Sequence, residues 1–188
     1  FDVESNIVGR NIDDFEGAFS IDNVIFTQAD KEISFNNLSL SAVEHENKTK
    51  ELKIYSDYVN GYVKGVYTFS EMVKNIYNLS HQYLPSILKE KKSFLSNETK
   101  NVNNFSFQLN LENMEPINEV YPLPFFVLEE SVVTGFYNNK DNKVKVRLES
   151  PRLQVGKNVF KDCMVLLENP QDEMKAIAYD MIKSLEEN

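Results

Sequence analysis

The chain has 188 residues, of which 41% are hydrophobic and 26% charged, and this composition excludes an intrinsically disordered segment. Its net charge of −9 at pH 7 excludes nucleic acid as an expected partner, because an acidic chain releases no counterions from DNA or RNA. A single cysteine, Cys163, excludes an intrachain disulfide, and no apolar run reaches the roughly 18 residues that span a bilayer.

Alternating apolar and polar residues dominate the first third of the chain. A first strand is predicted over Val3–Val8, and further runs extend from Phe19 to Phe69. Side chains of a strand point alternately to opposite faces, so each run predicts a strand with one apolar face. The links at residues 28–31 and 45–50 are short and predict antiparallel neighbours. The apolar members are Phe19, Ile21, Val24, Phe26, Ile33, Phe35, Leu38, Leu40, Leu52, Ile54, Val59, Val63, Tyr67 and Phe69.

The period changes at Ser70, which suits the N-cap of a helix. Apolar residues then recur at helical spacing, and Pro85 cannot lie inside one continuous helix. We therefore expect two short helices, over about residues 71–82 and 85–94, followed by a polar loop that ends at Asn104.

The strand pattern resumes at Phe105 and continues through residues 105–111, 133–137 and 144–148. Residues 114–121 predict a turn of helix, and Asn138–Asn142 a hairpin turn. Pro151 is expected to separate the strand at 144–148 from a following one that contains Leu153 and Val155. A strand segment at 159–168 follows, and the tail at 171–188 fits a helix or a strand equally well.

The predicted fold class is mainly β with a minor α component: a curved antiparallel sheet, or open β-groove, with two short helices inserted near 71–94. Residues 1–188 form a single β-rich segment with a first strand set at 1–69, a helical insert and loop at 70–104, a second strand set at 105–170 and a tail at 171–188. Residues 51–69 and 105–150 echo one another, which suggests repeated strand units.

The search for chemistry yields no catalytic residue. The chain has two histidines, His45 and His81, and neither lies at metal-ligand spacing from a second ligand. Neither a Gly-x-Ser-x-Gly nucleophile motif nor a Gly-rich phosphate loop occurs. We therefore expect a protein that is not an enzyme and that holds no metal and no cofactor.

The apolar face then has two interpretations. It is the core of a closed sandwich, covered by a second sheet, or it is an open trough for an apolar molecule. The order of motifs bears on this choice.

Several segments resemble the AsmA-like/TamB family, in the long form found in Bacteroidota. Gly17–Phe26 and Ser56–Phe69 are similar to its repeated strand unit, and the second is followed by Tyr83-Leu84-Pro85-Ser86-Ile87. The later segments that match in order and spacing are Asn104–Phe107, Thr134–Asn138, Pro151–Leu153 and Met164–Pro170. The likeness covers nearly the whole chain, and the order of these degenerate motifs makes it specific.

The resemblance implies a translocation and assembly module of the cell envelope. Such proteins are anchored in the inner membrane by an N-terminal helix, span the periplasm and enclose an apolar groove within an incompletely closed sheet. They are associated with phospholipid transport to the outer membrane and with outer-membrane assembly. This chain would be a periplasmic middle segment that lacks the anchor and the C-terminal signature domain, so it would contact membranes and outer-membrane assembly proteins only through the full-length protein. The tail after Gln171 departs from the strand expected there if it is helical.

On this interpretation phospholipid acyl chains are the partner of the apolar face, because each buried CH₂ contributes roughly 0.8 kcal/mol. The alternative remains a closed β-sandwich that serves as a binding or scaffold module for protein or glycan partners. The residues expected to line the groove are Phe19, Ile21, Val24, Phe26, Leu52, Ile54, Val63, Phe105, Phe107, Leu109, Val144 and Val146.

Overall fold

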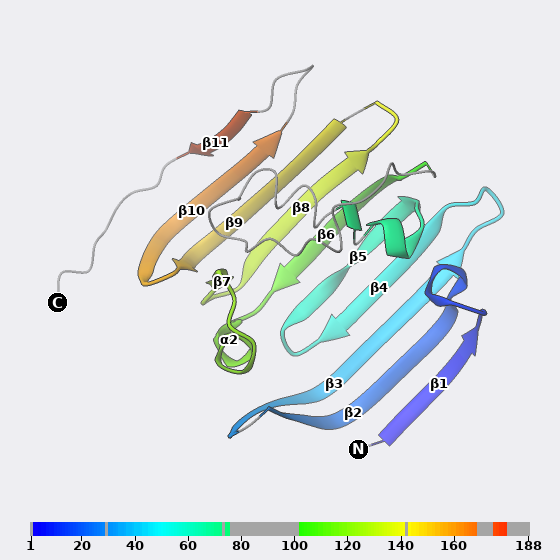
Figure 1. The fold of residues 1–188 in the computed structure, drawn as a ribbon, viewed down its shortest axis with the longest axis horizontal. Coiled ribbons are helices and arrows are strands. Elements are labelled where there is room, and N and C mark those ends of the chain that lie inside the picture. The colour runs from blue at the N-terminus through cyan, green and yellow to red at the C-terminus, as the bar shows by residue number, and fades with distance from the viewer. Residues whose placement is uncertain are drawn as a thin grey trace.

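The computed structural model describes residues 2–28, 30–72, 74–75, 102–141 and 143–168, and the backbone of 175–179. Its strands all belong to one antiparallel sheet of eleven strands (Figure 1), which confirms the predicted fold class. The elements are β1 (Asp2–Val8), η1 (Ile12–Asp14), β2 (Glu16–Gln28), β3 (Lys31–Glu44), β4 (Lys50–Ser56), β5 (Val59–Val66), β6 (Asn104–Leu111), α2 (Glu115–Val120), β7 (Phe125–Val127), β8 (Ser131–Asn138), β9 (Lys143–Val155), β10 (Asn158–Glu168) and β11 (Lys175–Tyr179).

The sheet is a meander in which almost every strand pairs with the next one along the chain. Its order is β1-β2-β3-β4-β5-β6-β8-β9-β10-β11, and the short β7 pairs with the far end of β9. Among the described strands, β1 pairs with β2 alone and β11 with β10 alone, so the sheet is open. The pairing of β5 with β6 joins the two predicted strand sets into one surface.

The predicted helical insert begins earlier than expected. Residues 69–72 and 74–75 are helical, and the Met72 N–H donates to the Thr68 carbonyl at 2.8 Å. Ser70 therefore lies inside the first turn, and the prediction that it is the N-cap is wrong. The rest of the first predicted helix, the second at 85–94 and the Tyr83–Ile87 motif lie outside the described residues.

The predicted turn of helix near residue 114 is confirmed as α2, with Pro116 in its first turn. This helix packs against β3, and the Lys31 Nζ donates to the Glu119 carbonyl at 2.7 Å. Lys31 begins β3 and Glu119 follows β6, three strand spacings further on, or about 14 Å. The chain after β6 therefore folds back across the ends of β4 and β5.

β2 and β3 bend together at Asn23. This residue has a φ of 53°, a left-handed conformation that Asn adopts more readily than most residues. Opposite it, the Asn36 backbone N–H donates to the Asp57 Oδ2 at 2.6 Å. The bend thus leaves this donor satisfied by a side chain from the β4–β5 turn.

The bend keeps the apolar residues of β2 on one side of the sheet. In an unbroken strand Ile21 and Val24 would point to opposite faces, because they are three residues apart. Val24 is nevertheless only 8% exposed, whereas its neighbour Ile25 is 63% exposed. The left-handed backbone at Asn23 shifts the alternation of side chains by one residue. Ile21 and Val24 therefore lie on the same face, and the buried face continues beyond the bend.

A second bend overturns the prediction that Pro151 separates two strands. β9 runs through Pro151 to Val155, and its ladder with β10 resumes on both sides of the proline. Pro151 has no N–H to donate, and Asp162 opposite it is left-handed, with a φ of 49°. Because the ladder already skips this pair, the proline costs no hydrogen bond.

The structure describes part of the C-terminal tail predicted at residues 171–188. Lys175–Tyr179 forms β11 and pairs antiparallel with β10, so the strand alternative holds for these five residues. Residues 169–174 and 180–188 lie outside the described part of the chain.

The left-handed backbone at Asn23 predicts opposite effects for two substitutions. Asn23→Val should lower the free energy of unfolding by about 1–2 kcal/mol, because a β-branched side chain clashes in this conformation. Asn23→Gly, which enters the region freely, should stay close to the parent chain. Urea unfolding of both variants checks this, and equal losses would show that the bend does not depend on the backbone of residue 23.

Candidate functional site

The strand register aligns apolar residues into a row that crosses the sheet. Successive pairings connect one residue from each of nine neighbouring strands, β1 to β6 and β8 to β10, and none of the nine carries a polar side chain. This first apolar row is Ile7, Gly17, Ala42, Leu52, Val63, Phe107, Gly135, Val146 and Leu167.

A second apolar row runs beside the first on the same face. Its only polar member is Ser5, in the edge strand β1. The row is Ser5, Phe19, Leu40, Ile54, Gly61, Leu109, Val133, Leu148 and Val165.

The opposite face has a different character. The row that lies between these two on that face is mostly polar, and Lys53, Gln108 and Arg147 stand in it. Seven of the twelve predicted groove residues lie in the two apolar rows: Phe19, Leu52, Ile54, Val63, Phe107, Leu109 and Val146. The sheet is therefore two-sided, as the alternation predicted.

The other five predicted residues extend the same face. Ile21 continues it in β2, and Val24 and Phe26 follow beyond the bend at Asn23. Phe105 and Val144 flank Tyr137 in a third row toward the other strand end. The structure thus places all twelve on one face. The prediction missed Leu40, Val133, Leu148 and Leu167, although the same alternation marks them in the sequence.

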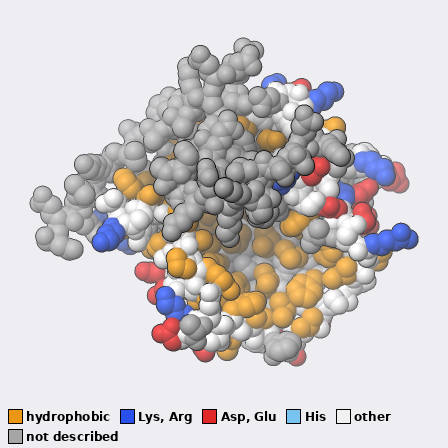
Figure 2. Space-filling view, viewed as in Figure 1, with side chains coloured by type: hydrophobic (Ala, Val, Ile, Leu, Met, Phe, Trp, Pro, Cys, Tyr) orange, Lys and Arg blue, Asp and Glu red, His pale blue; other side chains and the backbone are white. Residues whose placement is uncertain are grey.

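Burial is uneven across this face. Phe105 and Val144 are 3% and 4% exposed, whereas Phe26 is 44% exposed at the far end of β2. Most of the others are half-buried. Figure 2 shows the apolar side chains gathered in a hollow on the face toward the viewer, with charged side chains along its margins.

Two buried clusters lie on the face, at opposite ends of the strands. One consists of Tyr67, Met72 and Phe105, and the other of Val127, Leu153 and Cys163. Segments that follow strands supply part of each cluster, since Met72 comes from the helical turn after β5 and Val127 from β7. The hollow between them is bounded by protein at both strand ends.

Glycine makes room for aromatic packing on this face. A Cβ on Gly135 would lie 2.6 Å from Cζ of Phe107, its partner in the first apolar row. The Phe107 ring therefore lies over Gly135, which is a close approach that a side chain would prevent. Gly61 and Gly65 likewise face the backbone of β6.

Ion pairs gather on the polar face. Glu51 lies 3.4 Å from the Lys53 Nζ, 3.7 Å from the Lys64 Nζ and 3.9 Å from the His45 Nε2. Burial would raise the pKa of Glu51, but the hydrogen bond from Lys53 and the nearby positive charges hold that pKa below its usual value. On the same face Arg147 pairs with Glu149. These pairs suit a surface in contact with water.

The histidines do not assemble a recognisable reaction centre in the described part of the chain. His45 lies in the β3–β4 turn beside Glu51, half exposed, and His81 is outside the described residues. Within the described ranges, no group of three or more His, Cys, Asp or Glu side chains is placed to hold a metal.

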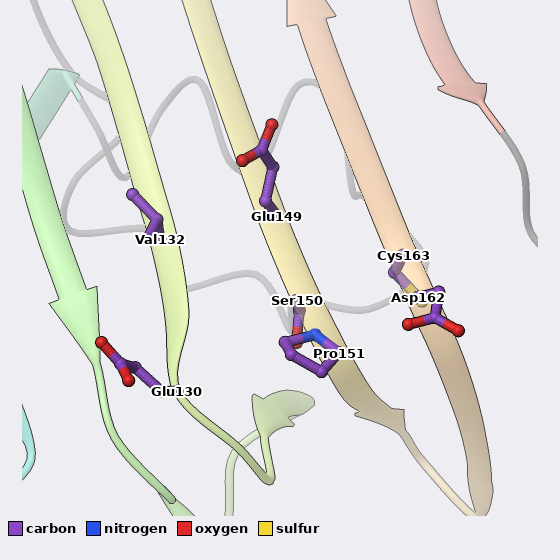
Figure 3. Close-up of a pocket in the computed structure, with 7 residues that line it drawn as sticks. All are labelled: Glu130, Val132, Glu149, Ser150, Pro151, Asp162 and Cys163. Carbon is purple, nitrogen blue, oxygen red and sulfur yellow. The ribbon is translucent and has the colours of Figure 1, made fainter.

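A separate pocket of about 340 Å³ lies at the bend of β8, β9 and β10 (Figure 3). Pro151, Cys163 and the acidic residues Glu130, Glu149 and Asp162 are among the residues that line it. Burial raises the pKa of the Cys163 thiol, which keeps it in the unreactive protonated form. The pocket carries no nucleophile with an adjacent base.

Comparisons with protein families, with curated proteins and with solved structures find no match to this chain. Among the described residues, no helix has the length and apolar character needed to cross a membrane.

Tyr67 provides a test of burial on the apolar face. Burial, and then the charge of Glu51, raise the pKa of Tyr67 to about 12, although a hydrogen bond with the Leu52 backbone opposes the rise. Since the raised pKa favours the neutral phenol in the folded state, its contribution to stability is complete below pH 10 and is lost between pH 10 and about 12.

Tyr67→Phe should remove one tyrosine that ionises near pH 12 from the ultraviolet absorbance titration of the folded chain. The variant should also lose less free energy of unfolding than the parent between pH 10 and 12. A difference titration centred near pH 10 would contradict the burial of this side chain.

Proposed function

We propose that this chain is a non-enzymatic segment of a periplasmic bridge that conducts phospholipid between the inner and outer membranes. Acyl chains lie along the apolar rows, and head groups stay in water at the open edge. The observation that carries the proposal is the continuity of the two apolar rows across nine strands. The sequence resemblance to the AsmA-like/TamB family supports the same function and the periplasmic location.

The dimensions of the face suit an acyl chain. Nine strands at a spacing of about 4.8 Å make each apolar row roughly 38 Å long. One leaflet of a bilayer core, which approximates one acyl chain, is about 15 Å thick. The rows are therefore longer than the cargo, as a conduit requires and as a pocket for a single bound molecule does not.

The energetics favour transfer of an acyl chain from water to this face. Burial of about ten methylenes contributes roughly 8 kcal/mol, at about 0.8 kcal/mol each. The contact is non-directional, so neighbouring positions along a row have similar free energies. A chain can then move along the row without crossing a site that binds it much more tightly.

The alternative of a closed sandwich requires a second sheet over the apolar rows. The described strands all belong to one sheet, so the described part of the chain supplies no such second layer. A scaffold for protein or glycan partners would also give no reason for apolar rows that continue across nine strands. The lipid interpretation accounts for that continuity directly.

Native mass spectrometry tests the proposal. The purified chain, after exposure to phosphatidylethanolamine vesicles, should retain lipid, and Ile54→Glu should reduce the retained lipid at least about tenfold. Ile54 lies in the second apolar row, between Leu40 and Gly61, so the variant places a carboxylate in the acyl path.

Tyr55→Glu is the matched control. It puts the same charge at the next residue of β4, on the polar face, where Tyr55 is 60% exposed. It should retain lipid like the parent chain, and circular dichroism establishes that both variants fold. Absence of retained lipid in the parent, or equal losses in both variants, would contradict the lipid groove.

A further inference from the structure

The segment that follows β5 covers part of the apolar face. We call residues 67–72 the cover segment. Its Tyr67 and Met72 are 7% and 5% exposed and pack with Phe105, and Leu52, Val63 and Phe107 of the first apolar row lie against this cluster. The cover segment thus occupies the surface on which the proposed cargo would lie.

One side of the cover segment is fixed by a buried residue. Asn103, which is 0% exposed and precedes β6, accepts a hydrogen bond from the Thr68 N–H at 3.4 Å and donates its Nδ2 to Glu71 at 3.0 Å. Its backbone exchanges two hydrogen bonds with Asn139, at 2.9 and 3.0 Å. Breaking these buried bonds would leave polar groups unsatisfied, which makes this side hard to release.

The other side is held by two exposed hydrogen bonds to a half-buried residue that lies far away in the sequence. Asp13, in the β1–β2 loop, accepts hydrogen bonds from the Ser70 N–H at 2.7 Å and from the Ser70 Oγ at 2.8 Å. The first bond satisfies a free N–H at the start of the helical turn, and the carboxylate suits the positive end of the helix dipole. Both bonds face water, which competes for them.

Hydrogen bonds within and beside the β1–β2 loop hold Asp13 next to Ser70. The Asn11 side chain accepts from the N–H groups of Asp13 and Asp14, at 2.8 and 3.2 Å, and so shapes the η1 turn. The Lys50 Nζ donates to the Asp13 carbonyl at 2.6 Å. Asp13 precedes β2 and Ser70 follows β5, so the contact crosses three strand spacings, or about 14 Å.

We propose that Asp13 is a releasable latch for the apolar face, with Asn103 as the fixed side. While Asp13 holds Ser70, the cover segment lies on the first apolar row; when the two hydrogen bonds break, the segment swings about Asn103 and uncovers that row at Phe107. This regulation of access rests on the proposed lipid function of the face.

Hydrogen–deuterium exchange with mass spectrometry tests the latch by itself. In Asp13→Asn, the amides of residues 69–72 should exchange about 2- to 30-fold faster, the range expected for loss of a helix N-cap interaction. Asp14→Asn is the matched control, because it removes the same charge from the same loop, and Asp14 bonds Asn11 and not Ser70 in the described contacts. Amides of β4 and β6 should be unchanged in both variants, which shows that the sheet stays folded.

A second measurement tests access to the face. Uptake of fluorescent phosphatidylethanolamine from phosphatidylcholine vesicles should be faster in Asp13→Asn than in Asp14→Asn. Equal exchange of residues 69–72 in the two variants would overturn the latch, and faster exchange without faster uptake would overturn its control of access. Failure of every chain, parent included, to take up lipid would instead defeat the proposed function and with it the regulation that rests on it.

Discussion

The register of the antiparallel ladder is the constraint on which the rest of the structure depends. Each pairing places residues opposite one another, and a slip of one residue would send a whole strand's apolar side chains to the other face. Nine strands keep a common register, and as a result residues as distant as Ile7 and Leu167 fall in one row. The short turns of the meander help to fix that register, because a tight turn permits few alternative pairings. The apolar face is a property of the ladder as a whole rather than of any single strand.

The two bends show how the chain keeps this face continuous. Both occur where two neighbouring strands deviate together, at Asn23 opposite Asn36 and at Pro151 opposite Asp162. At each place the ladder skips one pair of opposed residues and one residue takes a left-handed conformation, which costs free energy. This free-energy cost is offset because apolar side chains beyond the bend are still buried, as Val24 is beyond Asn23. Such paired bends also change the direction of the strands and so shape the hollow seen in Figure 2.

The strand ends give the face its boundaries. Lys31 bonds to the chain after β6, and Asp13 bonds to the chain after β5, so a connection that spans three strand spacings crosses the strands at each of their two ends. These ties are polar and lie at the margin, whereas the rows between them are apolar. On the proposed function, the polar margins and the apolar floor would separate head group from acyl chain without any reactive side chain. The pocket lined by Glu130, Glu149 and Asp162 belongs to a different part of the sheet and adds nothing to this separation.

The sequence by itself determined most of the strands, their two-sided character and twelve residues of the apolar face, because a period of two residues follows from the geometry of one strand. It also placed a turn of helix near Glu115. It could not show that Ile21 and Val24 share a face, since their spacing depends on a bend formed by two strands and the β4–β5 turn. It misjudged Pro151 and Ser70 for the same reason: whether a proline breaks a strand, and which residue caps a helix, depends on partners distant in the sequence, here Asp162 and Asp13. Only the tertiary structure decided these points, because they rest on contacts between segments whose separation along the chain carries no periodic signal.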